Sequence, residues 1–209
     1  MTREQSAIVK PESWTEALDL NSIFRARSGM TGSMEKNRRL EVEIGCGKGT
    51  FLLSRANAHR DTDFIAIDRM LKRLRRADSK VTRHGLDNVA LLRIEAAYAI
   101  EYLIPDNSVD ACFVLFPDPW PKKRHHRRRL FQESFLNSLA KTLKPGGKVH
   151  IATDHTDYFQ WISEMFAASD FFEETEPYKP APEEKTNFEI IFLQKDKQIN
   201  RCSYKLIDS

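Results

Sequence analysis

The fold of this chain is decided by one stretch, Leu40-Glu41-Val42-Glu43-Ile44-Gly45-Cys46-Gly47-Lys48-Gly49. Its first five residues alternate between apolar and charged side chains, which predicts a strand over 40–44. The three glycines predict a tight turn, and residues 50–58 have the spacing of a helix. A strand, a glycine turn and a helix in this order begin a doubly wound α/β sheet.

Strands and helices continue to alternate along the chain. Further strands are predicted at 64–68, 89–93, 109–116 and 148–153. Further helices are predicted at 69–83, 96–103, 128–143 and 158–168. The last two apolar segments, 187–193 and 201–207, predict an antiparallel hairpin at one sheet edge, after a solvent-facing loop over 173–185. We therefore expect a Rossmann-like α/β fold with a mostly parallel seven-stranded sheet and a C-terminal hairpin.

Composition bounds the class of protein. The 209 residues are 41% hydrophobic and 30% charged, which suits one soluble domain. No apolar run approaches the ~20 residues of a membrane-spanning helix, and the first twelve residues lack a secretory signal. Three distant cysteines and scattered histidines indicate a reducing cytoplasm and no metal site.

The polar start of the chain differs from the rest. We interpret residues 1–39 as a partly flexible N-terminal arm, with a short helix around Trp14 to Phe24. Residues 40–209 would then form the main domain.

The glycine turn predicts a ligand site at the carboxyl ends of the strands. Gly45, Gly47 and Gly49 let the backbone approach a ligand, and Thr50 stands where a dinucleotide fingerprint needs glycine, which disfavours a dehydrogenase. Acidic side chains follow or precede three strand ends: Glu43, Asp68 and Glu95. Asp68 could hold ribose hydroxyls, and Glu43 suits a cationic ligand, so S-adenosylmethionine fits both. The alternative is a turn that binds nothing.

A proline-rich loop, Phe116-Pro117-Asp118-Pro119-Trp120-Pro121-Lys122, follows the fourth predicted strand. Prolines at alternate positions stiffen the chain and hold Asp118 beside the cofactor turn. A carboxylate there can accept hydrogen bonds from guanine, and Trp120 can stack on a base. A purely structural turn is the alternative.

Basic residues follow this loop directly. Six of the eight residues in 122–129 are lysine or arginine, and a second basic face is predicted on the helix over 69–83. Such a run repels itself unless a polyanion such as RNA compensates it, although a solvated helix face is the alternative for the second surface.

Four motifs occur in the order Glu43–Gly49, Phe116–His125, Ala152–Asp154 and Thr186–Glu189. Together they closely resemble the bacterial tRNA (guanine-N7-)-methyltransferases, over Leu40 to the C-terminus. The resemblance implies a class I S-adenosylmethionine-dependent fold and methyl transfer to N7 of a guanine in the variable loop of tRNA.

The resemblance also implies roles for particular residues. Asp118 would be catalytic and would also contact the cofactor, together with Glu43, Asp68, Glu95 and the glycine turn. The substrate would be bound by Lys122, Asp154, Thr186, Asn187, Phe188 and Glu189. Asp68 is shorter than the glutamate often found at its position in this family.

Two other functions compete with this interpretation. A methyltransferase of small molecules or proteins would keep the glycine turn and its acids but leave the basic run unexplained. A non-catalytic RNA-binding module would not need Glu43, Asp68 and Asp118 together. The sequence leaves the oligomeric state, monomer or homodimer, and the choice of tRNA species open.

Overall fold

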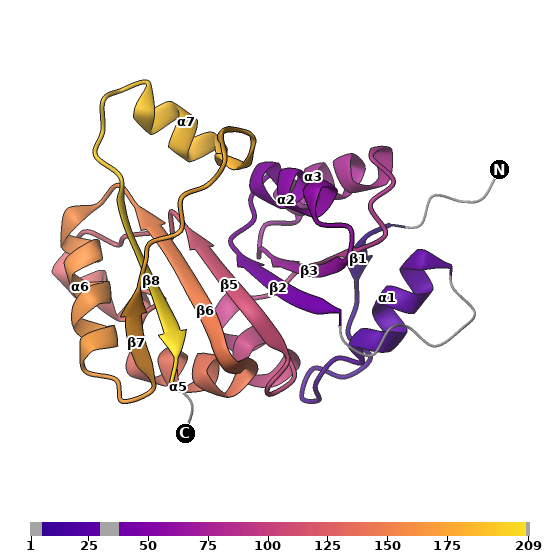
Figure 1. Ribbon diagram of the computed structural model, residues 1–209, viewed down its shortest axis with the longest axis horizontal. Helices are drawn as coiled ribbons and strands as arrows, with labels where there is room; N and C mark the ends of the chain where they lie inside the picture. Colours follow the sequence, from indigo (N-terminus) through magenta and orange to yellow (C-terminus); the bar gives the residue numbers. More distant parts are fainter. Residues whose placement is uncertain (1–5, 30–37, 208–209) are drawn as a thin grey trace.

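The computed structural model describes residues 6–29 and 38–207 (Figure 1). Residues 1–5 and 30–37 of the expected N-terminal arm lie outside the described residues. In the described part of the chain, one sheet runs through the whole molecule and has eight strands in the order β1-β4-β3-β2-β5-β6-β8-β7. The strands are β1 Ile8–Val9, β2 Arg39–Ile44, β3 Thr62–Ile67, β4 Val89–Leu92, β5 Val109–Leu115, β6 Leu143–Thr153, β7 Phe172–Thr175 and β8 Asn200–Leu206.

The sheet is parallel from β1 to β6, and β8 pairs antiparallel with both β6 and β7. The chain fills one half of the sheet outward from β2, then returns to place β5 on the other side of β2. This arrangement confirms the predicted doubly wound fold.

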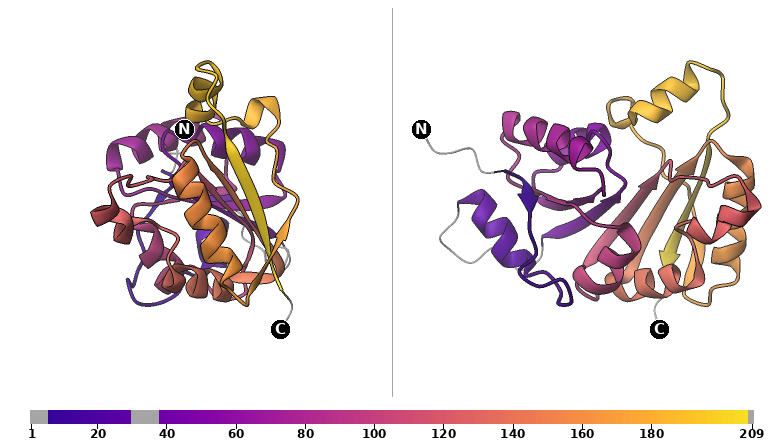
Figure 2. Two further views of the ribbon diagram at one scale, coloured as in Figure 1. Left: turned by 90° about the vertical axis from the view of Figure 1, so that its left-hand side faces the viewer. Right: turned by 180° about the vertical axis from the view of Figure 1, so that it is seen from behind.

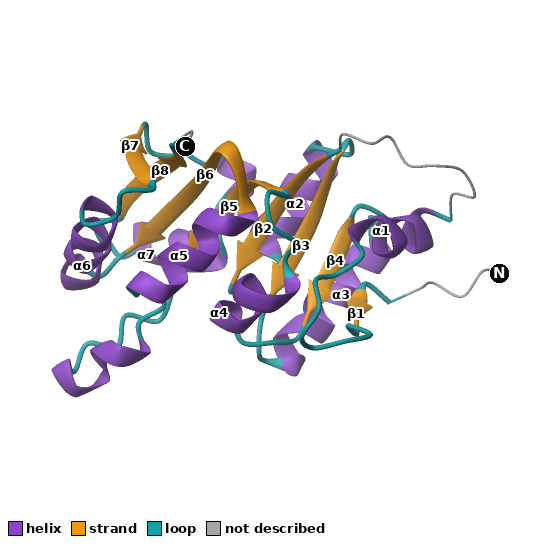
Figure 3. Cartoon of the chain, turned by 90° about the horizontal axis from the view of Figure 1, so that it is seen from below, coloured by secondary structure: helices purple, strands orange, loops and turns teal. Residues whose placement is uncertain are grey.

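Helices cover both faces of the sheet (Figures 2 and 3). They are α1 Leu20–Ser28, α2 Thr50–Ala58, α3 Leu71–Arg83, α4 Ala96–Tyr98, α5 Glu133–Thr142, α6 Thr156–Ala167 and α7 Asn187–Leu193, with a π-helical turn at Ala99–Leu103 and 3₁₀ turns at Lys123–Arg128 and Pro182–Glu184. Strand residues alternate between two cores because successive side chains point to opposite faces. Ile65 and Ile67 belong to the larger core, which also holds residues of α1, α5 and α6, whereas Phe64 and Ala66 belong to the core that holds residues of α2 and α3.

The predicted C-terminal hairpin exists, but its first strand was assigned wrongly. Residues 187–193 form helix α7, and the strand that pairs with β8 is β7. Thr186 caps α7, because its hydroxyl oxygen accepts a hydrogen bond from the Glu189 N–H at 3.0 Å. A short apolar run carries no clear period, so its sequence alone could not separate a helix from a strand. The expected solvent-facing loop over 173–185 likewise contains most of β7 and the buried Glu184.

The described part of the arm packs on the sheet. β1 pairs with β4 through Ile8 and Leu91 and supplies the eighth strand, which the sequence did not predict. The predicted short helix is α1, which begins later, at Leu20, and buries Phe24 in the larger core.

One helix and one strand begin at positions other than those predicted. The helix predicted over 128–143 begins at Glu133, because the basic residues before it form a 3₁₀ turn. β6 starts directly at Leu143 and is therefore longer than predicted. Over residues 6–29 and 38–207, none of the helices is long and apolar enough to cross a bilayer.

Candidate active site

Two loops meet where the direction of strand order reverses. β2 and β5 are parallel neighbours, so the segments after them emerge at the same edge of the sheet. The segment after β2 is the glycine turn, and the segment after β5 is the loop that carries Asp118. Crevices at such switch points bind ligands in open α/β sheets.

The glycine turn has a backbone that only glycine adopts freely. Gly45, Gly47 and Gly49 have φ values of +79°, +55° and +71°. A Cβ atom on Gly49 would also lie 3.0 Å from the Cβ of Ala77, so glycine lets α2 pack closely on α3. The turn is tied to the next strand, because the N–H groups of Gly45 and Cys46 both donate to the carbonyl of Ile67.

Asp68, at the end of β3, holds the turn from the side. One carboxylate oxygen accepts a hydrogen bond from the Gly47 N–H at 3.0 Å, and the other accepts from the Met70 N–H at 2.7 Å. The side chain is buried. Asp68 therefore shapes the glycine turn, and the remaining lone pairs of its carboxylate can face a ligand.

Glu43 is the one buried acid of this edge that lacks a full set of partners. Within the described residues its Oε2 atom is buried without a hydrogen-bond partner. Burial first, and then the negative charge of Asp68, raise the pKa of Glu43 to about 8, although a hydrogen bond from the Leu52 backbone acts in the opposite direction. An orphaned carboxylate oxygen beside a glycine turn suits a ligand that brings a positive charge.

Glu95 lies at the same edge, after β4. Its carboxylate caps α4 by accepting a hydrogen bond from the Tyr98 N–H at 2.9 Å, and the residue is exposed. Its role in cofactor binding stays a prediction, with one carboxylate oxygen already committed to the cap.

The loop after β5 has two residues in the left-handed region. Phe116 has φ +58° and Trp120 has φ +45°, which is uncommon for large side chains and is typical of functional loops. The Phe116 N–H donates to the carbonyl of Ala152 at 2.8 Å, which fixes the start of the loop to the end of β6. Asp118, between these two residues, is exposed at the strand ends.

Arg129 corrects the interpretation of the basic run. The basic run predicts a cation at this position that faces RNA, but the residue is only 2% exposed. Its guanidinium donates to the carbonyl of Pro119 at 3.0 Å, pairs with Asp157 and stacks on Tyr158 and Trp161. Arg129 therefore fixes the loop at Pro119, next to Asp118, and its buried guanidinium is unavailable to phosphate.

The other five cations of the run remain on the surface. Lys122 precedes the 3₁₀ turn, and Arg128 lies over the ring of Trp120 at 5.1 Å. The exposed ones are Lys122, Lys123, Arg124, Arg127 and Arg128. The second predicted basic face is also present on α3 and just before it, where Arg69, Lys72, Arg73, Arg76 and Arg83 are exposed.

Helix α7 brings the predicted substrate residues to the same edge (Figure 1). The ring of Phe192 lies 5.5 Å from that of Phe116, so α7 contacts the start of the Asp118 loop. Glu189 is buried and pairs with Arg201, whereas Asn187 and Phe188 are exposed.

Asp154 follows β6 and lies near the residues at the C-terminal end of α7. Its carboxylate accepts a hydrogen bond from Lys197 Nζ at 2.7 Å, and the same ammonium lies over the ring of Phe192 at 4.6 Å. Glu189 and Asp154 thus each have a basic partner already. A carboxylate can accept further hydrogen bonds, so each could still accept one from a substrate.

Sequence reasoning missed Arg55, Tyr178 and Arg201, as well as the true place of Arg129. Arg55 and Tyr178 bond to each other across 123 residues of sequence. No local spacing reports such a contact, and single arginines and tyrosines are common on surfaces. Among the described residues, no group of three or more His, Cys, Asp or Glu side chains could hold a metal ion.

The sequence matches the family described as "Putative methyltransferase" over residues 37–202. Curated relatives named tRNA (guanine-N(7)-)-methyltransferase include one from Corynebacterium efficiens, 37% identical over 88% of this chain and 72% of the relative. Another, from Halorhodospira halophila, is 34% identical over 79% of this chain and 74% of the relative. The chain belongs to the tRNA (guanine-N7-)-methyltransferase family.

Solved structures agree on the fold of this family member. The 16S rRNA methyltransferase KamB superimposes with a TM-score of 0.62 over 93% of this chain and 95% of that one, at 16% identity. A SAM-dependent O-methyltransferase from Thermotoga maritima gives 0.57 over 83% of this chain and 61% of that one, at 19% identity. The predicted class I methyltransferase fold is confirmed.

Members of this family take the methyl group from S-adenosylmethionine, and the residues at the switch point fit that cofactor. The orphaned Glu43 oxygen suits its positive charge, the turn from Gly45 to Gly49 leaves open backbone, and Asp68 ends the neighbouring strand.

Glu43 should make the cofactor-free protein less stable as pH rises. Its pKa is raised in the folded state, so the stability it permits at low pH is lost between about 4.3, the ordinary glutamate value, and the folded pKa of about 8. Glu43→Gln should therefore raise the free energy of unfolding at pH 8 by about 1–3 kcal/mol, with little difference near pH 5. The same variant should weaken S-adenosylmethionine binding in calorimetry.

Glu41→Gln is the matched control. Glu41 lies two residues earlier on β2 and is equally buried, but its carboxylate pairs with Arg55. This control should lower stability at pH 8. A loss of stability at pH 8 in both variants would contradict the raised pKa of Glu43.

Proposed function

We propose that this protein transfers the methyl group of S-adenosylmethionine to N7 of a guanine in the variable loop of tRNA. The observation that carries the proposal is the placement of Asp118, on a stiff loop, at the same switch point as the glycine turn and Glu43, whose Oε2 atom has no hydrogen-bond partner among the described residues. Membership of the family supports the base and the atom.

When bound, the cofactor supplies a methyl group made electrophilic by its sulfonium. Guanine N7 carries a lone pair and no proton, so the protein needs no general base at that atom. The demands on the protein are therefore to align N7 with the methyl carbon and to stabilise the positive charge that develops on the imidazole ring.

Asp118 meets both demands. Its carboxylate can accept hydrogen bonds from the N1–H and N2–H edge of guanine, which orients the base. Its negative charge also favours the cationic product ring. The loop keeps the carboxylate in place, because Arg129 holds the carbonyl of Pro119 and Ala152 holds the N–H of Phe116.

Substrate contacts would come from the elements around Asp118. Thr186, Asn187, Phe188 and Glu189 belong to α7 and its cap, and α7 touches the Asp118 loop through Phe192 and Phe116. Asp154 lies beside α7 through Lys197. Lys122 begins the exposed basic turn, where it can grip the phosphates that flank the target base.

The exposed basic turn favours a nucleic acid over a small or protein substrate. Five exposed cations in 122–128 would repel one another without a polyanionic partner. A guanine in a loop is also the cheaper target, because a base must leave its stack to react, and loop bases are the least costly to turn out.

The function is tested with purified protein, S-adenosylmethionine labelled on its methyl group, and unmodified tRNA. We expect label in tRNA, and chemical cleavage at 7-methylguanine should map it to the variable loop. Cleavage elsewhere in the tRNA would refute the loop assignment, and unlabelled tRNA would refute the function. Failure to bind S-adenosylmethionine would favour the RNA-binding module.

Replacing Asp118 with alanine should abolish most of the turnover and leave the cofactor bound. Loss of one charge-stabilising contact costs ~3–4 kcal/mol, which corresponds to ~100-fold or more in kcat. Single-turnover assays on tRNA and calorimetry with S-adenosylmethionine measure the two effects. Asp106→Ala, an exposed aspartate before β5, is the control and should retain activity. Near-normal turnover in Asp118→Ala would remove this residue from the mechanism.

Neutralising Lys122, Lys123 and Arg124 together should weaken tRNA binding and flatten its dependence on salt. Each lost phosphate contact lowers the slope of log K against log salt by roughly 0.7–0.9, so the triple variant should lose about two units. A control triple variant at the other end of the strands, Arg39, Lys141 and Lys148, removes equal charge from exposed positions. Equal slopes in the wild type and the first variant would argue against phosphate binding by this turn.

A further inference from the structure

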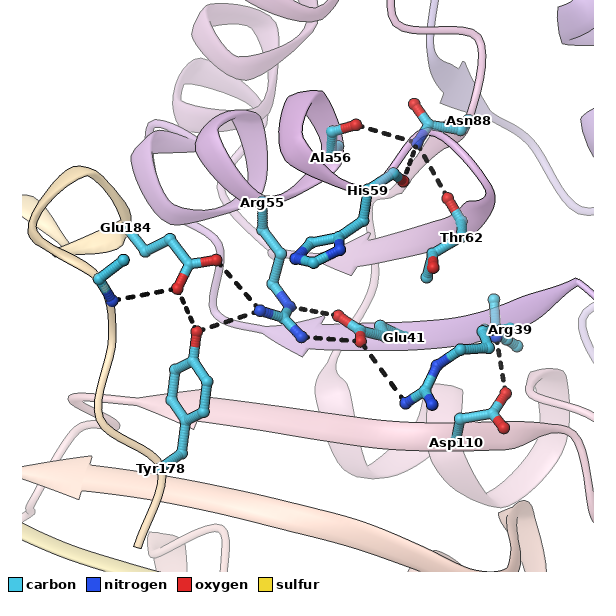
Figure 4. A network of polar contacts seen from close by, with 12 residues as sticks. Arg39, Glu41, Arg55, Ala56, His59, Thr62, Asn88, Asp110, Tyr178 and Glu184 are labelled. Atoms are coloured by element: carbon cyan, nitrogen blue, oxygen red, sulfur yellow. Dashed lines mark hydrogen bonds and ion pairs between the residues drawn. The ribbon is translucent and has the colours of Figure 1, made fainter.

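A partly buried polar network joins the cofactor side of the molecule to the segment that precedes α7 (Figure 4). Its centre is Arg55, on α2, the helix that begins directly after the glycine turn. Its other members are Glu41 on β2 and Tyr178 and Glu184 from the chain that leads to α7.

Arg55 uses its whole guanidinium in this network. Its Nε and one terminal nitrogen donate to the two carboxylate oxygens of Glu41, the latter at 2.9 Å. The other terminal nitrogen donates to the Tyr178 hydroxyl and to a Glu184 oxygen, both at 3.1 Å. A planar fork of this kind is beyond the reach of lysine.

Tyr178 is held from both ends. Its hydroxyl donates to Glu184, and its ring packs edge-on against Phe113 at 5.2 Å. Its backbone N–H donates to the hydroxyl of Ser203 on β8 at 3.0 Å, and that hydroxyl also contacts His150. The tyrosine therefore fixes the segment to β5, β6 and β8 as well as to α2.

Charge keeps the network closed. Burial alone would raise the pKa of Glu184, but hydrogen bonds from Tyr178 and Ala181 and the charge of Arg55 lower it, so the carboxylate stays ionised. His150, on the other side of Tyr178, is neutral, because burial and then the charges of Arg55 and Lys148 lower its pKa to about 4. Arg55 is thus the cation that Glu184 needs.

The helix that follows has little packing of its own. Four large apolar side chains of α7 are 40–50% exposed: Phe188, Ile190, Ile191 and Leu193. α7 is only seven residues long, too short to be stable alone. Three sets of contacts therefore hold α7 in place: the ion pair of Glu189 with Arg201, the ring contact of Phe192 with Phe116, and the Arg55 network. The Arg55 network ends at Glu184, two residues before the Thr186 cap.

We infer that Arg55 is a positioning residue for the substrate: through Tyr178 and Glu184 it sets where α7 presents Thr186 and Glu189 to the target base. This inference rests on the proposed function and adds to it a residue that contacts neither cofactor nor substrate. The same arginine lies two turns after the glycine turn, so one rigid helix would locate both reactants.

Tyr178→Phe tests the inference, because it removes one hydroxyl from the network and keeps the ring packed on Phe113. It should lower kcat/KM for tRNA by about 10- to 100-fold, the range for a small misplacement, while the Kd for S-adenosylmethionine stays unchanged. Hydrogen exchange should become faster at the backbone amides of 187–193. Arg55→Lys, which keeps the charge and loses the fork, should behave alike.

Tyr204→Phe is the matched control. Tyr204 is buried on β8, outside the network, and its ring stacks on Phe166 at 3.8 Å. It should leave kcat/KM for tRNA and exchange in α7 at wild-type values. Unchanged exchange in α7 of Tyr178→Phe, or an equal loss of cofactor and tRNA affinity, would overturn the inference. A wild type without activity on tRNA would refute the proposed function instead, and the exchange result would still decide whether Tyr178 anchors α7.

Discussion

The arrangement of this protein depends on one constraint: the chain must leave β4 and return to pair β5 with β2. Because of this reversal, the connections after β2 and β5 run in opposite directions along the sheet. The carboxyl ends of these two neighbouring strands are therefore left without a helix directly between them. The glycine turn occupies one end and the proline loop the other. An acid that is costly to bury, Glu43, and a loop with uncommon backbone angles, from Phe116 to Trp120, are both held there by the packed sheet.

Much of the fold could be predicted because parallel strands and their helices carry strong periodicity. The central strands and α2, α3 and α6 were found within a few residues of their ends. The strands at the two edges of the sheet, β1 and β7, are harder to predict. β1 has two residues, and β7 reads Phe172-Glu173-Glu174-Thr175, which looks like a solvated loop. Helix α7 has the sequence pattern of a strand, because its seven residues form a short apolar run without a helical period.

The candidate site divides along similar lines. Asp68 and Asp118 follow the ends of β3 and β5 as expected, since strand ends are predictable, whereas their roles in binding stay predictions. The sequence alone does not show which of the cations are buried and which are exposed. In the run from Lys122 to Arg129, counting gives six cations of one kind, whereas the structure buries Arg129 under the loop and leaves the other five outside. Partners distant in sequence, Asp157 and Trp161, cause that difference.

The position of β8 has a consequence for how the protein is made. β8 lies between β6 and β7 in the sheet, although it follows both in the sequence. It supplies Ser203, which binds the Tyr178 N–H, and Arg201, which pairs with Glu189 of α7. On the ribosome, β7 and α7 emerge before the strand that holds them. The half of the molecule around the glycine turn can pack early, whereas α7 and the segment before it must wait for β8 to insert. Placement of α7 is therefore a late event in biosynthesis, and an incomplete chain can form the glycine turn and its helices before α7 is held in place.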